Sequence, residues 1–159
     1  LEAGEIQIVA TDHCPFNYAK EKQDGKDDFR KCPNGAPGVE ERMILLFSEG
    51  VMKNKISINK LVEVACTNPA KVYGMYPKKG IIEPGADGDL IIIDADAKQT
   101  LTHEMMHGAV DYTSYEGTSL NGKIDLVMQR GNIIAENNEF KGNRGDGEYI
   151  YRKPYLGHF

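Results

Sequence analysis

The sequence lacks any apolar run that approaches the roughly 18–20 residues of a transmembrane helix, and no signal-peptide pattern opens it. It also lacks a surplus of basic residues. The formal net charge is −5, so the electrostatic footprint of a nucleic-acid-binding protein is missing. These absences argue against a membrane and against nucleic acid as partners.

Cysteine is scarce. Cys14, Cys32 and Cys66 are odd in number and widely spaced, whereas a disulfide framework prefers an even set. None of them forms a Cys-x-x-Cys pair, which argues against a structural zinc site built from thiolates. The cysteines therefore favour a reducing, cytoplasmic location.

The composition is that of an ordinary globular protein. Apolar residues make up 40% of the 159 residues and charged residues 27%, enough for one hydrophobic core. The chain begins with Leu1 instead of Met, which favours a fragment of a longer protein over a natural N-terminus.

The first half predicts one strand, a long loop and helices. The β-branched run at 6–10 predicts a strand, and the polar, Gly- and Pro-containing stretch at 14–38 predicts a functional or disordered loop. Apolar spacing predicts an amphipathic helix over 39–50 and a second helix with Ser57 as its N-cap. Asn68-Pro69 predicts the N-cap and first position of a third helix that stops at Gly74.

The second half predicts mostly short strands. A tight turn around Pro84 and Gly85 leads into the continuous run 90–93, which predicts a buried strand. Gly131-Asn132 lies between two apolar runs and predicts a two-residue hairpin turn. One strand with three helices cannot close a core alone, and a complete α/β barrel needs roughly 250 residues, which again favours a fragment.

Asp12 is the strongest candidate functional residue. It lies two positions beyond the predicted strand at 6–10, after Thr11, and in α/β barrels the carboxyl ends of the strands carry catalytic residues. The competing interpretation is a carboxylate that merely caps a loop or helix.

Several motifs follow one another in a characteristic order. They are Thr11-Asp12-His13-Cys14, Pro33-Asn34-Gly35, Glu40-Glu41-Arg42, Asn68-Pro69-Ala70-Lys71, Lys79-Gly80-Ile81, Gly85-Ala86-Asp87-Gly88-Asp89-Leu90, Asp111-Tyr112, Tyr115-Glu116-Gly117 and Arg152-Lys153-Pro154. In this order and spacing the chain resembles the D-hydantoinase/dihydropyrimidinase family of the amidohydrolase superfamily, over essentially its whole length.

The resemblance implies an α/β fold, the C-terminal portion of a metal-dependent (β/α)₈ TIM barrel plus strands of a small β-sandwich domain. Residues 1–78 would hold the last barrel strand, the active-site loop and the following helices. Residues 79–140 would supply sandwich strands and connections, and 141–159 a tail that contacts another subunit in a homodimer or homotetramer.

The resemblance also implies a reaction and its residues. The full enzyme hydrolyses the cyclic amide bond of hydantoins or dihydropyrimidines to N-carbamoyl amino acids. Asp12 matches a carboxylate that binds one of two zinc ions and serves as general base, a role that suits a water made acidic by metal. Asn34 matches a residue whose backbone contacts the cyclic substrate, and the same residue is a good turn former. His13 is expected to support the site without binding the metal. Neighbouring side chains of a strand point to opposite faces, so the His13 side chain would point away from that of Asp12.

The other ligands that the resemblance implies, among them a carboxylated lysine, are not found in this sequence, so the chain alone is expected to be inactive. Two alternatives remain: an allantoinase- or dihydroorotase-like amidohydrolase, and a non-enzymatic assembly protein of the same fold. The loop Pro33-Asn34-Gly35 favours the hydantoinase branch over the first. An assembly protein has no chemical reason to keep both Asp12 and Asn34.

Two other motifs invite false assignments. The segment 103–107 matches the His-Glu-x-x-His signature of zinc proteases, but the surrounding residues do not predict the long helix that this site needs. Arg144-Gly145-Asp146 matches an adhesion tripeptide, and Gly142 to Gly147 is glycine-rich like a phosphate loop, but neither has the required context. We interpret His103 and His107 as surface residues and 142–147 as an exposed turn.

Overall fold

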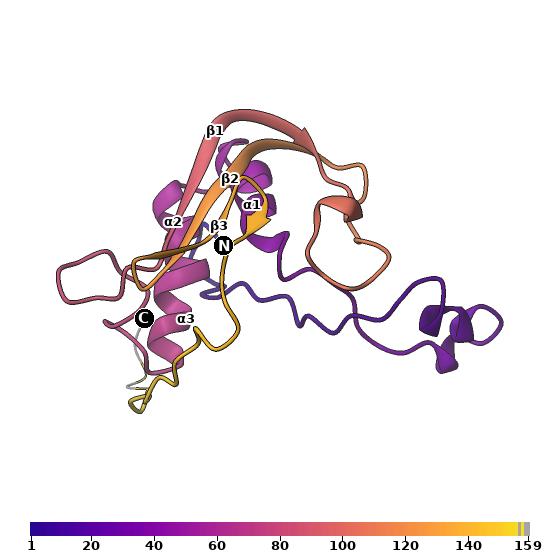
Figure 1. Cartoon of the computed structure of the whole chain (residues 1–159), viewed down its shortest axis with the longest axis horizontal. Coiled ribbons are helices and arrows are strands. Elements are labelled where there is room, and N and C mark those ends of the chain that lie inside the picture. The colour runs from indigo at the N-terminus through magenta and orange to yellow at the C-terminus, as the bar shows by residue number, and fades with distance from the viewer. Residues whose placement is uncertain (156, 158–159) are drawn as a thin grey trace.

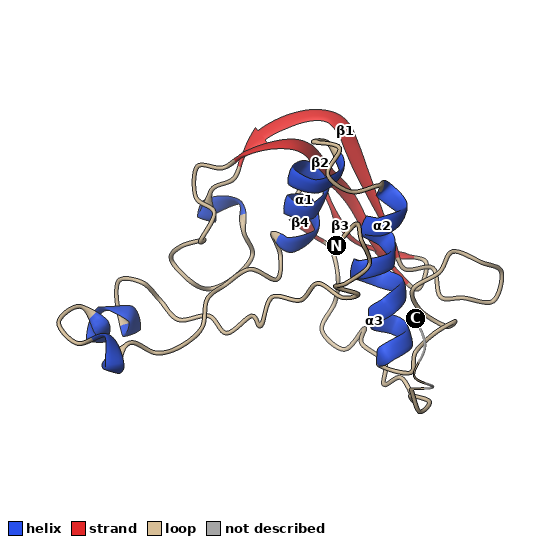
Figure 2. Ribbon diagram, turned by 180° about the vertical axis from the view of Figure 1, so that it is seen from behind, coloured by secondary structure: helices blue, strands red, loops and turns tan. Residues whose placement is uncertain are grey.

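The computed structural model describes residues 1–155 and 157. Helices pack against one face of a small four-stranded sheet, and a long loop that carries two short 3₁₀ turns extends away from both (Figures 1 and 2). Part of the predicted subunit-contact tail, residues 156 and 158–159, lies outside the described residues. Within the described part of the chain, no helix is long and apolar enough to cross a membrane.

The helices follow the apolar periodicity of the sequence. Helix α1 (Arg42–Leu45) continues into a π-helical stretch, Leu46–Val51. Helix α2 (Ile58–Val62), a π-helical stretch (Glu63–Thr67) and helix α3 (Asn68–Val72) follow without interruption. The predicted helices are therefore present, with the second and third fused into one.

The helix ends test the predicted caps. The Ser57 hydroxyl oxygen accepts the Lys60 backbone N–H at 3.0 Å, which confirms this N-cap. Gly74 ends the fused helix with φ +67, as predicted. The prediction for Asn68 was wrong: it lies inside the helical run, 1% exposed, and its side-chain amide donates to the Gln7 carbonyl at 2.9 Å. Asn68 is thus used for a tertiary contact instead of a cap.

The sheet is an antiparallel meander. Its strands are β1 (Leu90–Thr100), β2 (Ser119–Gln129), β3 (Asn132–Glu136) and β4 (Glu139–Phe140), hydrogen-bonded in sequence order. The predicted β2–β3 hairpin is confirmed, but its two turn residues are Arg130 and Gly131, with φ +47 and +81. The turn thus begins one residue earlier than the Gly131-Asn132 prediction.

The structure differs from two predictions about strands: 90–93 is not buried, and 6–10 does not form a strand. Ile91 and Ile92 of β1 are 40% and 56% exposed, so this strand is not buried: it lies at the sheet edge, and the helices cover one face only. The opening run 6–10 joins no strand of the described sheet. It is tied instead to the fused helix, where the Val9 N–H donates to the Val64 carbonyl at 3.1 Å.

The core lies between the helices and the inner face of the sheet. Its buried members are Ile44, Phe47, Ile56, Leu61, Ala65, Leu101 and Leu120. Gly122 in β2 has φ +103, and a Cβ there would lie 2.7 Å from the Phe47 ring, so glycine is needed for the ring to pack on the strand. Helices and sheet share one core, and the divisions at 78/79 and 140/141 stay predictions.

Candidate functional site

Asp12 lies where the opening segment enters the long loop. Its φ is +48, in the left-handed region that few residues with a side chain adopt and that Asp and Asn tolerate best. Its side chain is exposed. Backbone outliers of this kind concentrate at functional sites, so the conformation is a physical reason to propose a function for this carboxylate.

The two ends of the long loop run side by side. His13 forms an isolated parallel bridge with Ala36, and the Cys14 N–H donates to the Ala36 carbonyl at 3.1 Å. This pairing brings the segment that carries Asp12 next to the segment that carries Asn34. The two predicted site residues, 22 positions apart in sequence, therefore lie on adjacent pieces of backbone.

His13 holds this arrangement to the start of the helical region. Its Nδ1 accepts the backbone N–H groups of Gly38 at 3.2 Å and Val39 at 3.3 Å. One ring nitrogen is therefore engaged with backbone, which suits a supporting residue. That role stays a prediction.

The Asn34 turn is closely packed. Gly35 has φ +126, and a Cβ there would lie 2.4 Å from the Cys14 carbonyl oxygen, so only glycine fits between the two segments. Lys22 Nζ donates to the carbonyls of Pro33 and Gly35. Lys22 could not be singled out from the sequence, because one lysine in a polar loop carries no signal that separates it from its solvated neighbours.

The far part of the loop is anchored to a segment distant in sequence. The Asp111 carboxylate accepts the backbone N–H groups of Tyr18 at 2.6 Å and Ala19 at 2.9 Å, and these bonds lower the pKa of Asp111. The rings of Tyr18 and Tyr112 lie 5.8 Å apart. Asp111-Tyr112 thus ties the loop to the segment between β1 and β2.

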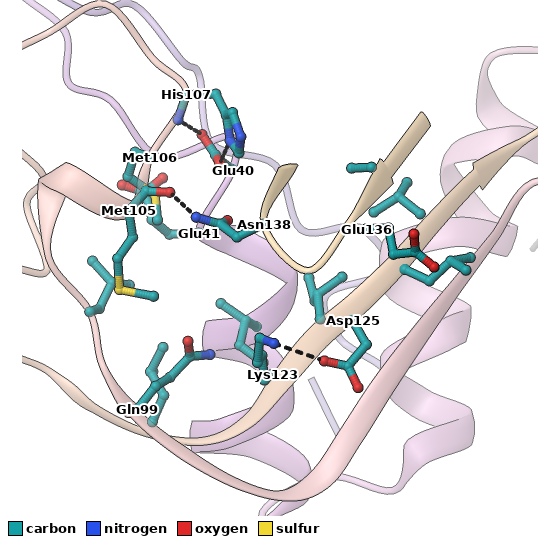
Figure 3. Close-up of a pocket in the computed structure, with 17 residues that line it drawn as sticks. Glu40, Glu41, Gln99, Met105, Met106, His107, Lys123, Asp125, Glu136 and Asn138 are labelled. Carbon is teal, nitrogen blue, oxygen red and sulfur yellow. Dashed lines mark hydrogen bonds and ion pairs between the residues drawn. The ribbon is translucent and has the colours of Figure 1, made fainter. Parts of the chain in front are cut away.

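A cavity of about 280 Å³ lies between α1 and the sheet (Figure 3). Apolar side chains, Leu101 and Leu120 among them, form much of its wall, and Glu41 is buried beside it with a hydrogen bond from Thr113 Oγ1 at 2.6 Å. Asp12 and Asn34 do not line this cavity. The cavity is thus a feature of the helix–sheet contact and separate from the predicted site.

At the mouth of that cavity His107 pairs with Glu40. The His107 Nδ1 lies 2.7 Å from Glu40 Oε1, and the His107 backbone N–H donates to Glu40 Oε2 at 2.9 Å (Figure 3). The hydrogen bond that the imidazole donates to the Glu40 carboxylate raises the pKa of His107 above its ordinary value of 6.5. The protonated imidazole is thus favoured in the folded chain.

We expect this pair to stabilise the fold mainly at low pH. A pKa raised by folding adds stability that is fully present below the unfolded-state value and is lost as pH rises through the folded-state value. Because the His107 side chain is 45% exposed, solvent screening limits the gain to less than about 1 kcal/mol. Urea unfolding of wild type and Glu40→Gln from pH 5.5 to 9 should show a difference in the free energy of unfolding that becomes smaller as pH rises. A difference that does not change with pH would contradict the stabilising role of the pair.

The segment 103–107 does not form a zinc-protease helix. His103–Met105 is a single 3₁₀ turn, and Met106 is extended, so His103 and His107 do not share a helix face. His103 lies instead with Glu104 and Glu116, whose potential ligand atoms are all within 4.8 Å of one another. Glu116 already accepts the His103 backbone N–H at 2.8 Å. Both histidines are partly exposed, in line with the interpretation as surface residues.

The glycine-rich stretch before the tail is an exposed turn, as predicted. Gly145 has φ +99, and the Asn143 N–H donates to the Asp146 carboxylate at 2.7 Å. Arg144 and Asp146 are exposed.

Comparison with known proteins agrees with this fold and motif order. Residues 1–134 match the amidohydrolase family. The chain is 45% identical to a D-phenylhydantoinase of Escherichia coli over 156 residues, which are 98% of this chain and 34% of that protein. The chain belongs to the amidohydrolase family.

The solved structures similar to this chain include hydantoinases and a dihydropyrimidinase. A dihydropyrimidinase from Brevibacillus agri superposes with a TM-score of 0.94 at 42% identity, over 97% of this chain and 33% of that one. An L-hydantoinase from Arthrobacter aurescens superposes with a TM-score of 0.87 at 34% identity, over 95% of this chain and 33% of that one. The chain spans about a third of the length of these relatives (34% for the E. coli protein). The predicted resemblance to the hydantoinase/dihydropyrimidinase group is confirmed.

Proposed function

We propose that this chain is part of a metal-dependent cyclic amidohydrolase that converts hydantoins or dihydropyrimidines to N-carbamoyl amino acids. The observation that carries the proposal is the 45% identity to a D-phenylhydantoinase over 98% of the chain. The pairing of the Asp12 segment with the Asn34 turn supports it, because it assembles an acid–base group and a substrate-binding turn at one place.

In this proposal Asp12 moves a proton. Hydrolysis adds water to the ring carbonyl carbon and breaks the carbon–nitrogen bond, so one proton must leave the water and one must reach the departing nitrogen. A carboxylate can accept the first proton and deliver it to the nitrogen. The Asn34 backbone binds the ring amide of the substrate, and His13 holds the Asp12 segment in place.

A carboxylate oxygen is an accepted zinc ligand, so Asp12 fits one position of a zinc centre. When bound, zinc supplies a water that loses its proton near pH 7. Zinc takes about four ligands, and Asp12 belongs to no group of three or more ligating side chains among the described residues. The chain therefore cannot hold two zinc ions at Asp12 alone. We propose that the other ligands, a carboxylated lysine among them, lie in the two thirds of the relatives' length outside the match, within a (β/α)₈ barrel.

The assembled enzyme is proposed to be a cytoplasmic homodimer or homotetramer. Cys14, Cys32 and Cys66 are free thiols in the structure, which suits a reducing compartment. Tyr149 and Tyr151 are 79% and 89% exposed, and their rings form an edge contact at 5.1 Å. Aromatic rings presented in this way are suited to a subunit contact.

Metal content and hydrolysis test the proposal directly. The full-length protein that carries this segment should bind about two zinc ions per subunit and open hydantoin or dihydrouracil, with the N-carbamoyl product quantified by chromatography. Faster opening of allantoin or dihydroorotate would instead assign a sister amidohydrolase. A protein with neither zinc nor turnover would overturn the proposed activity and favour the assembly-protein alternative.

We expect the 159-residue chain by itself to show neither tight zinc binding at Asp12 nor hydantoin turnover, because it supplies one ligand of the proposed centre. The measurement is the same assay on the isolated chain with added zinc. Clear turnover would show that the described residues suffice, and would contradict the proposed dependence on the remaining polypeptide.

A further inference from the structure

Lys22 makes two hydrogen bonds to the turn that contains Asn34. Its ammonium nitrogen donates to the Pro33 carbonyl at 2.5 Å and to the Gly35 carbonyl at 2.6 Å. These carbonyls belong to the residues on either side of Asn34. Both bonds are partly buried and carry a full positive charge on the donor, so they are stronger than bonds between neutral groups.

This contact sets the direction of the Asn34 backbone. In a trans peptide the C=O and N–H groups point in opposite directions. Because the Pro33 carbonyl points at the ammonium, the Asn34 N–H of the same peptide points away from it. The Gly35 carbonyl fixes the Ala36 N–H in the same way. The two bonds therefore hold the turn with its Asn34 donor on the side opposite Lys22.

The ammonium also changes the strength of that donor. Hydrogen bonds polarise one another along a chain, so a carbonyl that accepts from a cation leaves the N–H of the same peptide a better donor. A backbone donor that is already oriented and polarised binds the substrate more tightly than a mobile one, because less free energy is lost in ordering it on binding.

Lys22 is itself held in place. Its backbone N–H donates to the Asn17 carbonyl at 3.1 Å, and the Asn17 N–H donates to the Glu21 carboxylate at 2.9 Å. Its ammonium lies 5.5 Å from the centre of the Phe16 ring, a distance at which a cation and an aromatic face attract. The neighbouring residues Tyr18 and Ala19 are bound by Asp111.

We propose that Lys22 is a positioning residue for substrate binding: it orients and polarises the Asn34 turn, which in turn contacts the cyclic amide. The inference rests on the proposed function, because that function assigns the substrate contact to Asn34. Lys22 does not touch the substrate or the metal in this account. Its effect is therefore expected on binding more than on the chemical step.

The test compares three variants of the full-length protein. In Lys22→Met the ammonium is lost and an unbranched side chain of similar length remains. We expect the KM for the hydantoin to rise about 10-fold to 100-fold, the effect of losing a hydrogen-bonded charge, with a much smaller change in kcat. Lys22→Arg keeps a cation with several donors, and should bring KM back to within a few fold of wild type. Lys20→Met removes a lysine of the same loop whose side chain is 81% exposed, and should leave KM unchanged.

A second measurement needs no substrate. Amide hydrogen exchange of Cys14, whose N–H donates to the Ala36 carbonyl beside the turn at 3.1 Å, should become at least about tenfold faster in Lys22→Met and stay at the wild-type rate in Lys20→Met. Exchange that stays slow in Lys22→Met, or a KM that matches the Lys20→Met value, would overturn the positioning role.

The two measurements separate this inference from the function on which it rests. A wild-type protein that opens no cyclic amide overturns the proposed function, and with it the substrate role of the turn. The exchange rates then still decide whether Lys22 holds the turn. A wild-type protein that turns over with an unperturbed Lys22→Met variant overturns the positioning role alone.

Discussion

We expect Asp12→Asn in the full-length protein to lower kcat for the proposed hydantoin opening by about 10²-fold to 10⁴-fold, the range for loss of a positioned acid–base group. Asparagine keeps the size of the side chain and tolerates the left-handed backbone, here at φ +48, so the loop should keep its path. It cannot accept the proton from water or return it to nitrogen. Steady-state kinetics on purified wild type and variant give the measurement.

Asp27→Asn is the matched control, since Asp27 is an exposed carboxylate of the same loop. Its kcat should stay within about twofold of wild type, as expected for a surface carboxylate away from the chemistry. Zinc per subunit, measured by elemental analysis, should fall in Asp12→Asn and hold in Asp27→Asn. An Asp12→Asn enzyme with wild-type activity and wild-type zinc content would contradict both proposed roles of Asp12, as the acid–base group and as a zinc ligand.

We expect Leu101→Ala to destabilise the chain by about 2–5 kcal/mol, the range for truncating a buried leucine. Leu101 is 1% exposed and belongs to the core between the helices and the sheet. Its backbone is held on both sides, by the bond from its N–H to Thr118 at 2.9 Å and by the bond that it accepts from Gly117 at 2.8 Å. The neighbourhood therefore cannot collapse into the space that the side chain leaves, next to a cavity that already measures about 280 Å³.

Ile92→Ala is the control for this prediction. Ile92 is a large aliphatic residue of β1, but it is 56% exposed in the described structure, so its truncation should cost less than about 1 kcal/mol. Equilibrium unfolding of the 159-residue chain in urea compares the two. Equal losses at both positions would mean that the helix–sheet core is not the main source of stability.

The elements that could be predicted are those defined by a few neighbouring residues. The Ser57 cap, the helix stop at Gly74 and the β2–β3 hairpin follow from side-chain chemistry and backbone sterics within a few positions. The candidate Asp12 also came from a local pattern, a carboxylate after an apolar run. Its distinctive backbone conformation was not predictable from that pattern.

The predictions that were wrong depend on tertiary contacts, which a local sequence pattern does not contain. Asn68-Pro69 has the residue types of a helix start, but the Asn68 amide is used to hold Gln7, 61 positions away. The run 6–10 has the composition of a strand, but a strand needs a neighbouring strand, and the described sheet offers it none. The run 90–93 is apolar enough to be buried and yet lies at a sheet edge.

The residues that shape the candidate site show the same division. The motif order alone identified the family and singled out Asp12 and Asn34 as candidate site residues, because both inferences depend on residue identity and spacing along the chain. The tertiary structure alone shows that His13 pairs with Ala36 and that the Lys22 ammonium donates to the turn. It also shows that Asp111 accepts hydrogen bonds from the loop residues 92 and 93 positions before it. Propensities and backbone sterics act over a few residues, whereas contacts between distant segments exist only once the whole topology has closed the loops between them.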